Sequence, residues 1–66
     1  MTKEFINEVI QLSQLSVKEF AAEIYVNEQT VKRWMNGKSE PLFINQRLIR
    51  HCFKKEIRII NNKFNG

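Results

Sequence analysis

Aspartate is absent from this chain of 66 residues, and Cys and His occur only once each. A single Cys excludes an intramolecular disulfide, and with it the class of small secreted scaffolds held together by disulfides. One Cys, one His and no Asp also leave no zinc tetrad and no catalytic triad within the chain. We therefore expect no enzyme, no metal and no cofactor, and we expect the reducing cytoplasm as the compartment.

Long apolar runs are also missing. No stretch reaches the roughly 18 apolar residues of a membrane span, and the chain begins with a charged amphipathic segment rather than a secretory signal. We therefore expect no membrane-spanning segment. The length predicts a single small domain over residues 1–66, without repeats, linkers or low-complexity runs.

The charge is distributed unevenly along the sequence. Residues 1–31 contain two Lys and five Glu, a net charge of −3, whereas residues 32–66 contain nine Lys or Arg and two Glu, a net charge of +7. This asymmetry favours an anionic partner that approaches from one side, with nucleic acid as the first candidate and a membrane surface as the second. We choose nucleic acid and expect no membrane partner. The alternative is a basic composition inherited from an AT-rich genome.

The hydrophobic spacing predicts an all-α domain with four helices. Their expected ranges are about Lys3–Leu12, Val17–Ile24, Glu28–Met35, and Leu42 to Ile60 or beyond. Thr2 and Asn27 are suitable N-caps, and Ser16 with Glu19 forms a capping box. Gly37 stands where a left-handed residue ends a helix. The turn of three or four residues before the third helix predicts a helix-turn-helix over about residues 17–36.

The fourth predicted helix is amphipathic, and its interpretation leaves alternatives open. Its basic side either contacts DNA or is an ordinary solvated face; it carries Arg47, Arg50, Lys54, Lys55 and Arg58. A competing interpretation ends this helix near Lys55 and makes residues 56–60 a short strand, because Ile57 and Ile59 alternate with charged residues. Cys52 lies on the apolar side, so we expect it to be buried.

The apolar residues near the end of the chain exceed what a core of this size buries comfortably. They are Ile57, Ile59, Ile60 and Phe64. We therefore expect residues 42–64 to contribute a dimerisation element, with plain core or a frayed tail as the alternative.

The third predicted helix has one wholly polar side. At about 100° per residue, Glu28, Gln29, Lys32, Arg33 and Asn36 share one arc, opposite a mostly apolar arc. These side-chain types match the edges of bases in the major groove, since Arg and Lys pair with guanine and Gln and Asn with adenine. A solvated helix face also explains such an arc. The arc indicates DNA contact only because it lies on the second helix of a predicted helix-turn-helix.

The stretch from Leu15 to Pro41 reads LSVKEFAAEIYVNEQTVKRWMNGKSEP. It resembles the helix-turn-helix of the Cro/repressor (XRE) family, which typically shows LSQEELAEKLGVSxxTVSRWExGxxxP. The matching residues are Leu15, Ser16, Glu19, Ala21, Ile24, Val26, Thr30, Val31, Arg33, Trp34, Gly37 and Pro41. Three departures stand out: Tyr25 replaces the usual Gly of the turn, Val17 replaces a polar residue, and the C-terminal segment shows no clear break into separate fourth and fifth helices.

The resemblance implies a compact four-helix fold like that of lambda repressor. It implies base contacts by Asn27, Glu28, Gln29, Lys32 and Arg33, and phosphate contacts by Val17, Lys18, Asn36 and Lys38. The implied function is that of a small repressor of phage or mobile-element origin. It would bind double-stranded DNA as a homodimer in the bacterial cytoplasm, associated with the nucleoid. The alternatives are an excisionase-like recombination factor and an antitoxin-like or antirepressor-like module with a protein partner.

Overall fold

Helices make up most of the chain. The structure is a computed structural model that describes the backbone of residues 1–65 and the side chains of residues 1–63. The elements are α1 (Lys3–Ser13), α2 (Val17–Glu23), α3 (Glu28–Met35), α4 (Phe43–Cys52) and α5 (Lys54–Asn65). The all-α prediction is confirmed, and the first three helices lie within one residue of their predicted ranges.

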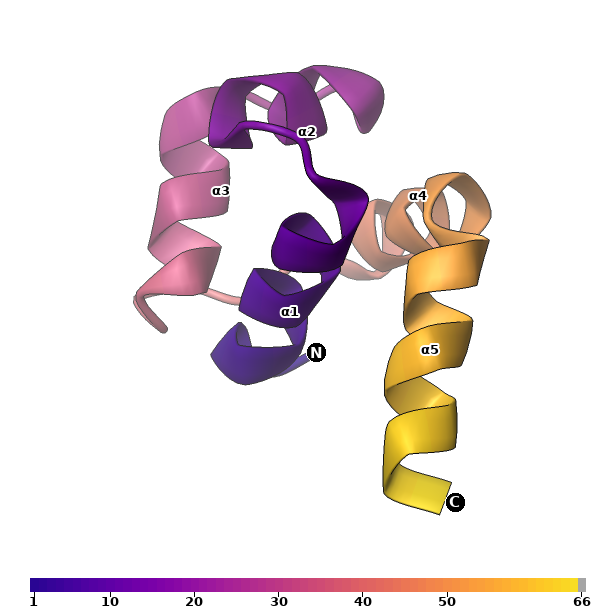
Figure 1. Cartoon of the computed structure of the whole chain (residues 1–66). Helices are drawn as coiled ribbons and strands as arrows, with labels where there is room; N and C mark the ends of the chain where they lie inside the picture. Colours follow the sequence, from indigo (N-terminus) through magenta and orange to yellow (C-terminus); the bar gives the residue numbers. More distant parts are fainter. Residues whose placement is uncertain (66) are drawn as a thin grey trace.

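The prediction of a single fourth helix was wrong. The helix stops at Phe53, whose backbone leaves the helical region (φ −124°, ψ 41°), and α5 starts at Lys54. The Phe53 ring is 5% exposed and stacks on Phe20 of α2, with ring centroids 4.7 Å apart. Packing of this ring against α2 accompanies the change of direction between α4 and α5 (Figure 1). The alternative strand was also wrong, because residues 56–60 are helical.

The predicted helix starts are confirmed. Thr2 Oγ1 accepts a hydrogen bond from the Phe5 N–H (3.1 Å). Ser16 Oγ accepts from the Glu19 N–H (3.0 Å), and Glu19 Oε1 accepts from the Ser16 N–H (2.9 Å), which completes the capping box. These local side-chain contacts satisfy N–H groups that have no partner inside the helix.

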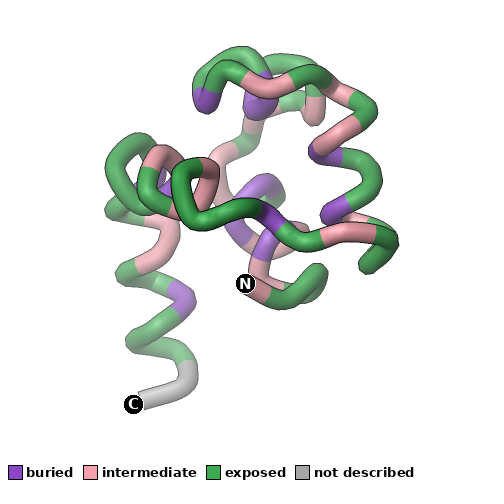
Figure 2. The backbone as a smooth tube through the Cα atoms, turned by 180° about the vertical axis from the view of Figure 1, so that it is seen from behind, coloured by how far each residue is buried: buried purple, intermediate pink, exposed green. Residues whose placement is uncertain are grey.

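The core is built around α1, which lies between α3 and α5 and contacts both (Figure 1). Its members come from every helix and are Ile6, Val9, Ile10, Phe20, Ala21, Ile24, Val31, Trp34, Ile49, Phe53 and Ile60. The burial pattern in Figure 2 shows these positions as short purple segments among exposed green ones. None of the helices in the described part of the chain is long and apolar enough to cross a bilayer.

Two expectations about the C-terminal half are corrected by this packing. Ile60 is only 1% exposed and belongs to the core, so its side chain is not available for a dimer interface. Ile57 is half-buried against the core, whereas Ile59 is 52% exposed. The side chain of Phe64 lies outside the described residues. Cys52, expected in the core, is exposed because the helix ends there and Phe53 takes the inward position.

Candidate nucleic-acid interface

The connection between α2 and α3 is short and tightly closed. It spans residues 24–27, and the Val26 N–H donates to the Ala21 carbonyl (3.1 Å). Ile24 is fully buried, while Tyr25 is 86% exposed and adopts a left-handed backbone (φ 61°). The chain therefore keeps the positive φ that suits Gly, although Tyr occupies the position.

The third helix, α3, has a buried apolar side and an outward polar side, as the sequence predicts. Val31 and Trp34 are buried in the core, which confirms the predicted inward position of Trp34. Asn27 caps the helix, because its Oδ1 accepts from the N–H and the hydroxyl of Thr30 (2.8 and 3.0 Å). With its apolar side held against α1 and α2, α3 turns its polar side away from the body of the protein.

Five polar side chains on this outward side line one surface depression of about 450 Å³, which we call the α3 groove. They are Gln29, Lys32, Arg33, Asn36 and Lys38, and all five are exposed. Three are cationic and two are carboxamides, so the lining has no carboxylate. All five were among the predicted site residues, and the fold gathers them on one surface.

The turn after α3 sets the position of Lys38, the last residue of the α3 groove in the sequence. Gly37 has φ 74°, as the sequence predicts. Its N–H donates to the Trp34 carbonyl (3.2 Å), and the Lys38 N–H donates to the Arg33 carbonyl (2.9 Å). This pair of hydrogen bonds is the Schellman arrangement, which reverses the chain after a helix. It holds the backbone of Lys38 beside the last turn of α3.

A contact that the sequence did not suggest anchors the same end of the helix. The Asn7 Nδ2 of α1 donates to the Met35 carbonyl (3.0 Å) and to the Lys3 carbonyl (2.9 Å). The carbonyls of the last helical turn have no partner within their helix. Asn7 provides a hydrogen-bond donor to one of these carbonyls and so connects the end of α3 to α1. Its only signal in the sequence is a polar residue beside the apolar positions of the first helix.

The remaining predicted site residues lie outside the α3 groove. Glu28 forms an ion pair with Lys32 (3.2 Å) at the first turn of α3, where its negative charge suits the helix dipole. Asn27 has its side-chain oxygen committed to the cap. Val17 is half-buried and packs against the core, so its apolar side chain is unsuited to a phosphate contact. Lys18, by contrast, is exposed on α2.

One ionisable group near this region has a perturbed pKa. The pKa of Glu19 lies below its ordinary value, because its carboxylate accepts the Ser16 backbone N–H and, with a smaller effect, interacts with the Ser16 side chain, and both contacts favour the charged form. The charged carboxylate of Glu19 therefore contributes to the capping box at the start of α2.

The arrangement of side chains therefore offers a cationic, amide-rich groove on the exposed side of a short helix. Nothing in it provides a nucleophile paired with a general base. Among the described residues, no group of three His, Cys, Asp or Glu side chains is placed to hold a metal ion. No protein-family model, curated protein sequence or solved structure matches this chain.

Proposed function

We propose that this protein is a sequence-specific reader of double-stranded DNA that regulates transcription, with α2 and α3 as its helix-turn-helix. The observation that carries the proposal is the convergence of Gln29, Lys32, Arg33, Asn36 and Lys38 on the α3 groove. A helix with its side chains is about 10–12 Å across, and the major groove is about 12 Å wide. The exposed side of α3 can therefore enter the groove that it would read.

Each side chain has a role in this proposal. Gln29 and Arg33 project from α3 and would contact base edges, since Arg is suited to guanine and Gln to adenine. Lys38 and Asn36, at the end of α3, would contact phosphates and set the register of the helix. Lys32 would approach the DNA only after its ion pair with Glu28 opens or rearranges.

The mode of action that we propose is occupancy of an operator as a small repressor. Two copies on a near-palindrome would place their α3 helices about 34 Å apart on one face of the duplex. The sequence predicted a dimer contact by Ile57, Ile59 and Ile60. Among these described residues, only Ile59 has a largely exposed side chain. The described side chains of α5 therefore offer little exposed apolar area for self-association, and we propose that two copies pair on DNA.

The experiment is a selection from random duplex DNA with the wild type and with Arg33→Ala in parallel. Arg47→Ala is the matched control, because Arg47 is exposed on α4 and lies outside the α3 groove. We expect an enriched motif in which Arg33→Ala relaxes one position at a cost of about 1–3 kcal/mol, while Arg47→Ala keeps the motif. If the Arg33→Ala variant enriches the same motif as the wild type, Arg33 does not contact a base. Two-fold symmetry would indicate a paired repressor, and an asymmetric motif would indicate the recombination factor.

A protein-binding role is the second candidate, and a specific observation favours it. Leu42, Phe43 and Ile44 are consecutive and are 70%, 71% and 59% exposed. Exposed apolar side chains that adjoin one another are typical of protein interaction sites. If this role is the main one, the selection will enrich no DNA sequence, and a stoichiometric partner will stay bound after nuclease treatment but be lost in Phe43→Ser.

A further inference from the structure

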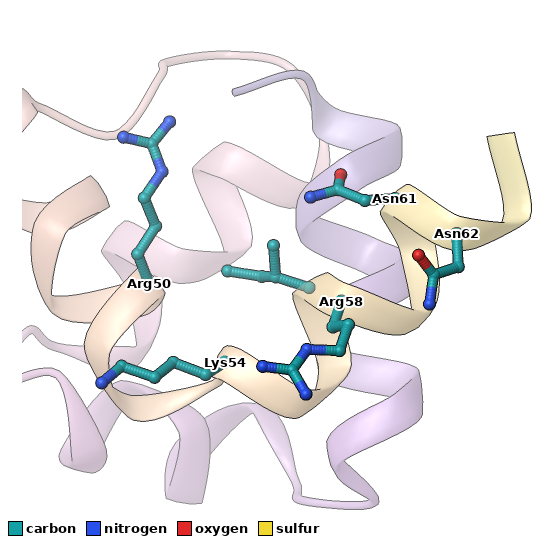
Figure 3. A pocket seen from close by; sticks show the side chains of 6 residues that line it. Arg50, Lys54, Arg58, Asn61 and Asn62 are labelled. Carbon is teal, nitrogen blue, oxygen red and sulfur yellow. The ribbon is translucent and has the colours of Figure 1, made fainter. Parts of the chain in front are cut away.

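A second cationic groove lies at the bend between α4 and α5. It has a volume of about 480 Å³ and is lined by Arg50, Lys54, Ile57, Arg58, Asn61 and Asn62. Figure 3 shows Arg50 on α4, Lys54 at the start of α5, and Arg58, Asn61 and Asn62 following along α5. We call this surface the α4–α5 groove. It exists because the chain bends at Phe53, which brings the end of α4 and the side of α5 around one hollow.

The charges of the α4–α5 groove are not balanced by the protein. Three of its six lining residues are cationic and none is acidic. The ion pairs found among the described residues join Lys32 to Glu28 and Lys63 to Glu8, so neither involves Arg50, Lys54 or Arg58. Like charges gathered in a concave surface create a local positive potential that attracts an anion.

The shape of the α4–α5 groove distinguishes between classes of anion. Five of its six lining residues are exposed, and only Ile57 is half-buried. A small ligand typically buries most of its own surface in an enclosed pocket, so this open surface suits part of a polymer. The buried centre of a protein interface is typically more apolar than its rim and depleted in charged residues, whereas Ile57 is the single apolar side chain in this lining. Arg, Lys and Asn are among the residue types that commonly contact DNA phosphates.

The position of the α4–α5 groove gives it a role separate from that of the α3 groove. In Figure 1, α3 and α5 lie on opposite sides of α1, which contacts both. The polar side of α3 points away from the core, whereas α5 turns Ile60 toward it from the other side. The two grooves share no lining residue, so a duplex bound along α3 does not occupy the residues of the α4–α5 groove.

We propose that the α4–α5 groove binds the phosphate backbone of a second DNA segment, so that one protein bridges two duplexes. The bridge rests on the proposed DNA reading by α3, but backbone binding by the α4–α5 groove does not. Contacts of this kind are independent of base sequence and sensitive to salt. A protein bound at one site would thereby hold a neighbouring or looped segment of DNA.

The test is capture of a fluorescent duplex by a second duplex fixed on beads, at about 0.15 M salt. The groove variant is Lys54→Gln/Arg58→Gln. Its matched control is Arg47→Gln/Lys55→Gln, which removes the same charge from exposed positions outside both grooves. We expect capture to fall about tenfold or more in the groove variant and to change less than about twofold in the control. An equal loss in both variants, or no loss in the groove variant, would overturn the proposal.

A second measurement separates the two grooves. In a Lys32→Gln/Arg33→Gln background, binding of one duplex of arbitrary sequence should persist, and adding Lys54→Gln/Arg58→Gln should lower its salt slope by about 2. If this binding persists while the wild type captures no second duplex, the α4–α5 groove binds DNA backbone but the bridge fails, and the selection from random duplex DNA decides separately whether α3 reads DNA. If an oligoglutamate of the same charge displaces the duplex at a lower concentration than unlabelled duplex does, the groove belongs to an acidic protein segment and the proposal fails.

Discussion

Replacement of Tyr25 by Gly should stabilise the protein. Tyr25 has φ 61°, a left-handed conformation that costs an L-residue about 1–2 kcal/mol. Its side chain is 86% exposed, so removal of the ring loses little packing. Gly also adds about 0.4–1 kcal/mol of conformational freedom to the unfolded chain. With mid-range values of about 1.5 kcal/mol for the strain and about 0.7 kcal/mol for the unfolded chain, the balance predicts a rise of about 0.5–1 kcal/mol in the free energy of unfolding of Tyr25→Gly.

The measurement is thermal unfolding followed by circular dichroism. For a domain of this size, 1 kcal/mol corresponds to about 4–8 °C in Tm, so Tyr25→Gly should unfold about 2–8 °C higher. Tyr25→Ala is the control, because Ala also removes the ring but leaves an L-residue at positive φ. It should therefore unfold close to the wild type.

A second left-handed residue checks the same reasoning at another site. Gln14 has φ 62° and is the exposed C-cap of α1. Gln14→Gly should raise Tm by a similar amount, and the two substitutions should add, because each acts on its own turn. Equal Tm values for Tyr25→Gly and Tyr25→Ala would refute the reasoning, since backbone strain would then contribute nothing measurable.

Two further predictions concern stability. Because the pKa of Glu19 is lower in the folded protein than its ordinary value, its stabilising contribution is present above that ordinary value and is lost as pH falls through the folded pKa. Urea unfolding at about pH 6 and about pH 3 should therefore show a smaller pH dependence in Glu19→Gln than in the wild type or in Glu23→Gln, a change at another exposed acid of α2. Ile60→Ala should lower the free energy of unfolding by about 2–5 kcal/mol because the side chain is buried, whereas Ile59→Ala should stay within about 0.5 kcal/mol. If Ile60→Ala does not fold, Ile60→Val should cost about 0.5–1.5 kcal/mol, and equal effects at the two positions would contradict the assignment of Ile60 to the core.

The parts of the structure that follow from local chemistry could be predicted from the sequence. Thr2, Ser16 and Asn27 act on N–H groups within three residues, so the helix starts follow from residue type and spacing. The polar side of α3 could likewise be predicted, because the helical period places its members on one arc. Lys38 joins these residues in the α3 groove because Gly37 adopts a left-handed conformation, and the sequence indicated that conformation as well.

The break at Phe53 could not be predicted, because no local signal marks it. The segment from Leu42 to Phe64 contains neither Gly nor Pro, and its apolar spacing fits one continuous helix. The deciding contact is the stacking of Phe53 on Phe20, which is more than thirty positions earlier in the chain. The α4–α5 groove was missed for the same reason, since its concave shape arises from the bend.

The central position of α1 also has a consequence for the order in which the protein assembles during synthesis. The ribosome makes α1 first, yet one of the two helices that cover it, α5, is made last. Domains generally fold as units, so Ile6 and Val9 remain without Ile60, a member of the same buried cluster, until α5 has left the exit tunnel. Until α5 is available, α1 therefore lacks one of the two helices that cover it. The α3 groove, whose supporting helix is α1, reaches its final geometry only after translation has passed α5.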